Sequence, residues 1–79
     1  MKEQAVQQAI LSMVEARGAG KSICPSEVAR RLQPEDWRAL MPEVRAAAAT
    51  LRAQGRLRVT QGGLEVDPET ARGPIRLGL

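Results

Sequence analysis

The fold is decided by residues 42–54, with the sequence PEVRAAAATLRAQ, and by the Gly55 that follows them. The apolar residues of this stretch recur at i, i+3, i+4 and i+7, as on one face of an amphipathic helix: Val44, Ala47, Ala48 and Leu51. Proline suits the first helical position, where its missing N–H has no intrahelical partner, and glycine suits the left-handed residue that closes a helix. The stretch therefore predicts a helix from Pro42 to Gln54 with an outward surface of small side chains edged by arginines.

Two further helices are predicted upstream. Residues 2–17 carry an apolar stripe that includes Val6 and Ile10, and glycines at 18 and 20 end that helix. Residues 25–32 (PSEVARRL) form the second, with Pro25 in its first turn. Residues 21–23 are expected to form an edge strand. A brief helical stretch that ends near Leu40 should be separated from the long helix by Pro42, because proline inside a helix costs about 3 kcal/mol.

The C-terminal third predicts a β-hairpin followed by an arm. Residues 56–60 and 64–67 alternate apolar and polar, and Gly62-Gly63 between them permits a two-residue turn. That turn places Val59 opposite Val66 and Arg58 opposite Asp67, whereas a three-residue loop places Val59 opposite Glu65. The two-residue turn is preferred because an apolar residue then faces an apolar residue and a charged residue faces a charged one. Residues 67–79 are expected to form an extended C-terminal arm that packs Ile75 and Leu77 on one side.

These elements predict one domain over residues 1–79, mainly α with a small β wing. The order of elements is that of a winged helix-turn-helix, with three helices and a two- or three-stranded antiparallel sheet. The core is expected to comprise the apolar positions that share a face within their own elements: Val6, Ile10, Met13, Val28, Leu32, Trp37, Leu40, Val44, Leu51, Leu57, Val59 and Val66.

The amino-acid composition limits the kinds of functional site that this chain can form. The net charge is +3 with a pI near 10.0, and ten of the twelve cationic residues are arginine. A single cysteine and no histidine leave no disulfide, no ordinary zinc site and no histidine-based acid–base pair, so we expect no catalytic site, metal or other cofactor. Cys24 is expected to be a buried small residue. The polar N-terminus and the lack of a long apolar run predict a cytoplasmic protein with no membrane contact.

Several segments resemble a family of small bacterial winged-helix proteins catalogued as a domain of unknown function, number 3253. The most specific are the segments P-S-E-V-A-R at 25–30 and R-G-P-I-R at 72–76, and the resemblance extends from the first helix to Leu77. It implies the fold and a bacterial origin. It implies no activity, so function has to be argued from the site.

The sequence predicts a non-enzymatic domain that binds double-stranded DNA with weak sequence specificity, as in a transcriptional regulator. The helix from Pro42 would lie in the major groove, and no Asn or Gln within 43–53 is present to read adenine. The candidate nucleic-acid contacts are Arg30, Arg31, Arg38, Arg45, Ala49, Arg52, Arg56 and Arg58.

Two alternatives stay open. Individual arginines can be structural: Arg45 as an internal clamp to Glu27 or Asp36, and Arg58 as a cross-strand partner of Asp67. The whole domain can instead be a non-catalytic protein-interaction or homodimerisation module, because small residues such as Ala46 and Ala53 allow another backbone to approach closely. No small-molecule substrate is predicted in either case.

Overall fold

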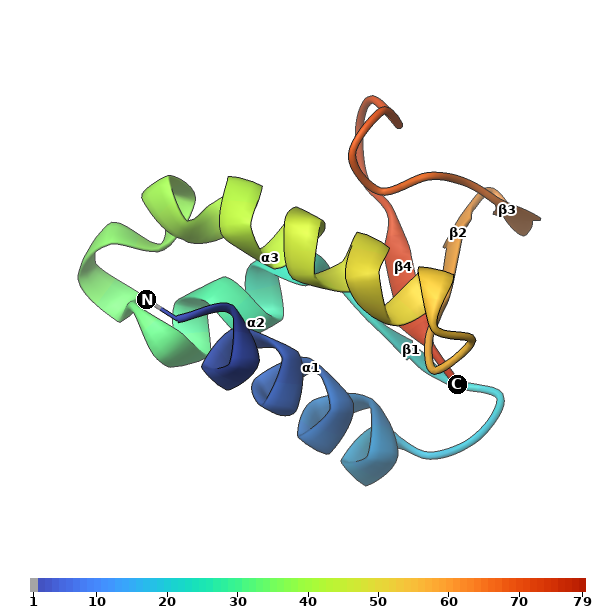
Figure 1. Cartoon of the computed structure of the whole chain (residues 1–79), viewed down its shortest axis with the longest axis horizontal. Helices are drawn as coiled ribbons and strands as arrows, with labels where there is room; N and C mark the ends of the chain where they lie inside the picture. Colours follow the sequence, from blue (N-terminus) through green and yellow to red (C-terminus); the bar gives the residue numbers. More distant parts are fainter. Residues whose placement is uncertain (1) are drawn as a thin grey trace.

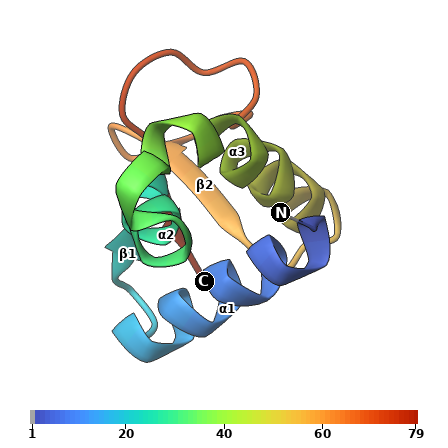
Figure 2. The ribbon, with the colours of Figure 1, turned by 90° about the vertical axis from the view of Figure 1, so that its left-hand side faces the viewer.

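The structure is a computed structural model that describes residues 2–79. The helices are α1 (Glu3–Arg17), α2 (Pro25–Leu32), a 3₁₀ turn (Pro34–Asp36) and α3 (Trp37–Ala53). The strands are β1 (Ser22–Ile23), β2 (Arg58–Gln61), β3 (Leu64–Glu65) and β4 (Arg76–Gly78). The three helices lie together, with the small antiparallel sheet at the end where α3 runs into β2 (Figures 1 and 2). The predicted fold class, mainly helical with a small β wing, is therefore confirmed.

The helix α3 is longer than predicted. It begins at Trp37, immediately after the 3₁₀ turn, and Pro42 lies inside it. The prediction that Pro42 separates two helices was wrong. Pro42 is exposed, and inside the helix it removes one N–H bond and crowds the carbonyl of residue i−4. This cost is offset because Leu40 and Met41 in the same turn pack against the core. The predicted end was right: Gly55 has φ of 73°, and the Arg56 N–H donates to the Leu51 carbonyl in the capping pattern that such a glycine allows.

The C-terminal segment is a strand at the centre of the sheet. The strand order is β1-β4-β2-β3, and β4 pairs antiparallel with both β1 and β2. The prediction of a two- or three-stranded sheet with a peripheral arm was therefore incomplete, because the sheet has four strands. Ile75 and Leu77 both point into the core, as the alternation predicted, and Leu77 pairs with Ile23 on one side and Val59 on the other. Figure 1 shows β4 lying between β1 and β2.

The hairpin register is confirmed. Thr60 pairs with Glu65 and Gln61 with Leu64, and the Val66 N–H donates to the Val59 carbonyl at 3.0 Å. Gly62 and Gly63 have φ of 59° and 85°, which is the left-handed pair that a tight two-residue turn needs. The two strands are shorter than predicted, because the chain turns away from the sheet after Glu65 and enters the loop at 67–74.

The core matches most of the prediction. Eight of the twelve predicted residues are buried: Val6, Ile10, Val28, Leu40, Val44, Leu51, Leu57 and Val59. The other four are half-buried and pack against the core: Met13, Leu32, Trp37 and Val66. The buried residues outside the predicted core include Ile23 and Pro68, both almost completely inaccessible to solvent. Neither lies in a periodic run long enough to reveal an inward face.

Two separate leucine substitutions test the central position of β4. We expect Leu77→Ala to lower the free energy of unfolding by about 2–5 kcal/mol, because it leaves a cavity in the core. Leu64→Ala is the matched control, since Leu64 is 73% exposed and should change stability by less than about 0.5 kcal/mol. The measurement is urea unfolding followed by circular dichroism. Equal effects at the two positions would contradict the placement of β4.

Candidate nucleic-acid interface

The outward face of α3 has small residues along its middle and arginines along one edge. Pro42 and Ala53 are exposed on this face, and Ala46 and Ala49 are partly exposed. The edge carries three arginines seven residues apart: Arg38, Arg45 and Arg52. Two helical turns separate each pair, about 10.5 Å along the axis at 1.5 Å per residue. The predicted helix surface therefore exists, although its arginines differ in what they contact.

At the start of α3, two arginines pack on the ring of Trp37. The guanidinium carbon of Arg30, from α2, lies 4.3 Å from the ring centroid, and that of Arg38 lies 4.5 Å away. Such cation–π contacts contribute about 0.5–1 kcal/mol at exposed sites. Neither arginine forms an ion pair within residues 2–79. We call Arg30, Trp37 and Arg38 the Trp37 patch. It presents two solvent-exposed guanidiniums that pack on one ring.

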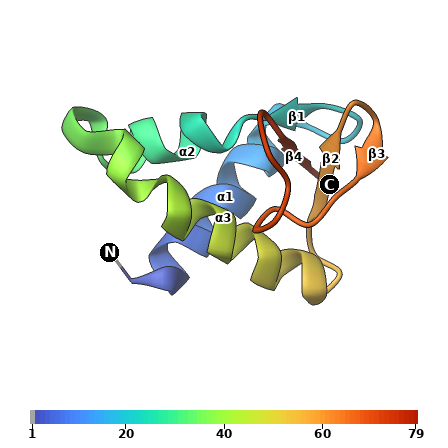
Figure 3. The same ribbon diagram turned by 90° about the horizontal axis from the view of Figure 1, so that it is seen from above.

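The third arginine, Arg45, is an internal clamp. Its Nη1 donates to the carbonyls of Pro68 at 3.1 Å and Ala71 at 2.8 Å, and its Nη2 donates to the carbonyl of Gly73 at 2.8 Å. These bonds hold the loop at 67–74, which we call the strap, against α3 (Figure 3). The alternative prediction that Arg45 is an internal clamp was therefore right, but its predicted partners were wrong. Backbone carbonyls take the place of the expected Glu27 or Asp36.

The strap is fixed from its other side as well. Gln61 Nε2 donates to the carbonyls of Arg72 and Pro74, and the side chain of Pro68 is buried. Asp67 accepts the Glu69 N–H through its Oδ1, and no ion pair to Arg58 is formed within residues 2–79. Between the strap and the first half of α3 lies an open groove of about 490 Å³ lined by Arg38, Met41, Pro42, Arg45 and Glu69.

The remaining candidate residues lie on other faces. Arg31 lines a hollow with Met13, Ala16 and Arg17, and Arg56 lies beside the glutamines of α1. Arg58 projects from the outward face of the sheet, near Lys21 and Ser22. The structure brings together Arg30 and Arg38, and it places Ala49 and Arg52 further along the same face of α3. It does not gather all eight residues into one surface.

A second polar cluster joins the start of α2 to the end of α1 and to β4. Glu27 accepts the backbone N–H of Cys24 at 2.7 Å through one carboxylate oxygen, and Arg17 at 2.6 Å through the other. The Cys24 hydrogen bond and the Arg17 charge, with a smaller effect of Arg76, hold the pKa of Glu27 below its ordinary value, and partial burial opposes them. The only hint in the sequence was an acidic residue in the first turn of α2. The distant partners Arg17 and Arg76 left no local signal.

The cluster also includes the thiol. Arg76 donates through Nε to the Ser22 hydroxyl at 2.9 Å and through Nη2 to the Ser22 carbonyl at 2.9 Å, and its Nη1 lies 2.7 Å from Cys24 Sγ. Cys24 is half-buried, whereas the sequence analysis predicted a buried residue. Arg76 thereby ties β4 to β1 and to the start of α2.

The Arg45 clamp predicts that its removal loosens the strap. We expect Arg45→Gln to lower the free energy of unfolding by about 1–3 kcal/mol, because three charge-assisted hydrogen bonds to carbonyls are lost. Amide hydrogen exchange should accelerate within residues 67–74 while the core of α1 stays protected. Arg52→Gln, on the same edge of α3 but exposed, is the control and should change neither quantity. Equal protection of the strap in both variants would contradict the clamp.

The carboxylate cluster predicts a pH dependence. A folded-state pKa below the ordinary 4.5 means that ionised Glu27 stabilises the fold above that pH, and that this stabilisation is lost as the pH falls through the folded-state pKa. Glu27→Gln should therefore be less stable than wild type at pH 7, and the difference should shrink on acidification. Urea unfolding at a series of pH values measures it, with the exposed Glu35→Gln as control. A difference that stays constant with pH would contradict the assignment.

Comparison with known proteins identifies a family for this chain and no activity. The segments P-S-E-V-A-R and R-G-P-I-R, distant in sequence, meet where Arg76 contacts Cys24 beside Glu27. No helix within the described residues combines the length and apolar character needed to cross a membrane. A search of the curated proteins finds no match. The chain belongs to the family described as Protein of unknown function (DUF3253), which matches it over residues 3–79.

Proposed function

We propose that this domain binds double-stranded DNA with weak sequence specificity, through the Trp37 patch and the outward face of α3. The observation that carries the proposal is the pair of guanidiniums over Trp37, which are exposed and form no ion pair within residues 2–79. A guanidinium fork matches the geometry of a phosphate, and the ring fixes its position before binding, which reduces the entropy lost on contact.

The order of elements supports the proposal. We interpret α2 and α3 as a helix-turn-helix pair, with α3 as the recognition helix, within a winged helix. The β2–β3 hairpin and the strap would form the wing beside α3 (Figure 3). Arg45 would then act indirectly, by positioning the strap, because both of its terminal nitrogens are already bonded to carbonyls.

The spacing on α3 suits a duplex. Arg38 and Arg52 are fourteen residues apart, which is about 21 Å along the helix axis. The major groove is about 12 Å wide, so arginines near the two ends of α3 can reach phosphates on opposite sides of it. Pro42 and Ala49 between them allow close approach and offer only apolar contacts. The expected binding is therefore mostly electrostatic, and a role as a transcriptional regulator would need specificity from elsewhere.

One observation favours a second candidate, a protein-interaction or dimerisation module. The strand β3 is at the edge of the sheet, and its Leu64 is 73% exposed. An open edge strand is a template for pairing with another chain. Two residues are a short edge, however, so we place this function second.

A salt titration tests DNA binding. Contacts by Arg30, Arg38 and Arg52 predict a slope of log affinity against log salt of about −2.7, at roughly −0.9 per phosphate. Arg38→Gln should flatten that slope by about 0.9 and weaken binding to every sequence similarly. Ala49→Glu should weaken binding further, because it places negative charge against the duplex. The measurement is fluorescence anisotropy of a random duplex at several salt concentrations.

The matched control is Arg31→Gln. It removes the same charge from the residue next to Arg30 in α2, and Arg31 lines a hollow away from the Trp37 patch. It should leave the slope unchanged. If the wild type fails to bind at low salt, or if Arg31→Gln and Arg38→Gln behave alike, the Trp37 patch is not a phosphate site. Size exclusion would then decide whether the protein self-associates.

A further inference from the structure

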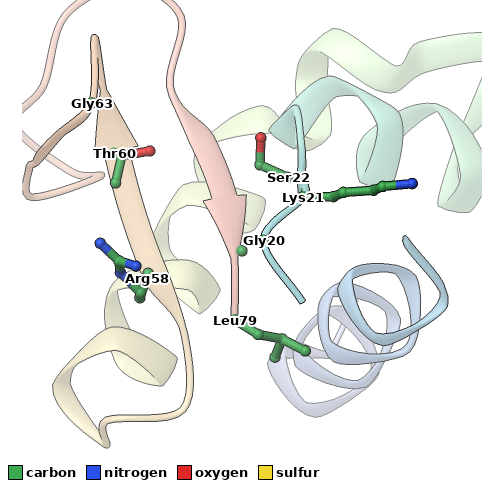
Figure 4. Close-up of a pocket in the computed structure, with 8 residues that line it drawn as sticks. Gly20, Lys21, Ser22, Arg58, Thr60, Gly63 and Leu79 are labelled. Atoms are coloured by element: carbon green, nitrogen blue, oxygen red, sulfur yellow. The ribbon is translucent and has the colours of Figure 1, made fainter. Parts of the chain in front are cut away.

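The last strand of the chain lies between two strands that come before it in the sequence. β4 pairs with β1 on one side and β2 on the other, and Figure 4 shows it between β2, marked by Arg58 and Thr60, and β1, marked by Ser22. Ile75, which precedes β4, and Leu77 within it are buried. Without β4, the strand edges on either side of it would be open, and an open edge is a template for a strand of another chain.

A tight turn at the start of the strap connects β4 to the rest of the chain. The N–H groups of Thr70 and Ala71 donate to the Asp67 carbonyl at 3.2 Å and 2.9 Å. Pro68 is buried, whereas Glu69 and Thr70 are exposed. The two exposed residues therefore lie between two buried anchors, the proline before them and the apolar residues of β4 after them. At this point the chain can change direction without moving either anchor.

Arg45 bonds to both sides of the two exposed residues. Its Nη1 donates to the Pro68 carbonyl at 3.1 Å and to the Ala71 carbonyl at 2.8 Å. In an extended chain, these two residues would be separated by about 10 Å. One nitrogen can therefore reach both carbonyls only while the turn is closed, so the two bonds stabilise the closed turn specifically.

The other side-chain bonds of the strap do not depend on the turn. Gln61 Nε2 donates to the carbonyls of Arg72 and Pro74, which both follow the turn. If β4 entered the sheet of a second copy, these bonds and the core contacts of β4 would form again there. Only the closed turn and the bond from Arg45 to the Pro68 carbonyl would be lost. Exchange of an identical element between two copies is a low-cost route to a dimer.

We propose that Arg45 is a latch that keeps β4 in the sheet of its own chain, and that opening of the turn at Glu69 and Thr70 gives a dimer that exchanges β4. The partner is a second copy of this chain, and the surface that it uses is the pair of strand edges at β1 and β2. This inference does not depend on the proposed DNA binding. It also differs from pairing at the edge of β3, which would leave β4 in place.

The test is refolding of Arg45→Gln from urea at several protein concentrations, followed by size exclusion with light scattering. The variant should dimerise about a hundredfold more tightly than the wild type. The reason is that neither of its two chains has a latch to open, and one hydrogen bond to a charged group corresponds to about tenfold. Arg52→Gln, an exposed arginine on the same edge of α3, is the control and should behave like the wild type.

Isotope labelling distinguishes exchange from any other dimer. In a dimer refolded from a mixture of labelled and unlabelled chains, isotope-filtered NMR should detect the contact between Leu77 and Val59 across the two chains. A dimer that keeps this contact within each chain would overturn the proposal. So would an Arg45→Gln protein that stays monomeric at every concentration, or an Arg52→Gln protein that dimerises to the same extent.

A second variant keeps the proposal testable if Arg45→Gln fails to fold. Deletion of Glu69 and Thr70 leaves Arg45 in place and makes the turn too short to close, and a short hinge loop favours exchange. The deletion should give the same exchanged dimer. A folded monomer would contradict the proposal, as would the failure of both variants to form a discrete dimer.

Discussion

The insertion of β4 between β1 and β2 is the constraint on which the rest of the structure depends. Without β4, β1 has no pairing partner, and β2–β3 is an isolated hairpin, which is marginal in water. Leu77 buries its side chain between Ile23 and Val59, so one residue connects three strands through the core. The last strand of the chain therefore closes the sheet against which the C-terminal half of α3 packs.

That insertion has consequences for the intervening chain. Between β3 and β4 the chain has to return along the molecule, and the strap is the segment that does so. Its backbone carbonyls have no strand to pair with, and the bonds to those of Pro68 and Ala71 are partly buried, where an unpaired carbonyl is costly. Arg45 and Gln61 satisfy five of them from side chains on α3 and β2. An arginine suits this role because its fork donates to several carbonyls at once.

Sequence patterns predicted the elements with strong periodicity or turn chemistry. The bounds of α2 and the hairpin register followed from Pro25 and from Gly62-Gly63, whose effects are local. Two errors arose from long-range packing. Pro42 looked like a helix start because its intrinsic cost is high, but burial of Leu40 on the same helix outweighs it. The alternation at Ile75 and Leu77 indicated an inward face, but no local signal identifies which strands will flank it.

The candidate site was predictable by residue type and less so by position. Arginine-rich composition indicated anion recognition, yet Arg17, Arg45 and Arg76 are engaged with a carboxylate, carbonyls and a hydroxyl within the fold. Sequence alone cannot separate such arginines from exposed ones, because their partners are 5 to 54 residues away.

The division between structural and exposed arginines determines where the surface charge lies. Once the structural arginines are set aside, the exposed ones divide among the Trp37 patch, the far end of α3, the surfaces beside α1, the outward face of the sheet and the strap, which carries Arg72. A net charge of +3 spread in this way gives no single strongly basic face, so long-range steering of a polyanion is weak. At the interface that we propose, recognition would therefore depend on local geometry, in which two guanidiniums pack on one indole ring. A group that is positioned before the ligand arrives loses less entropy on binding, so modest charge would be sufficient there.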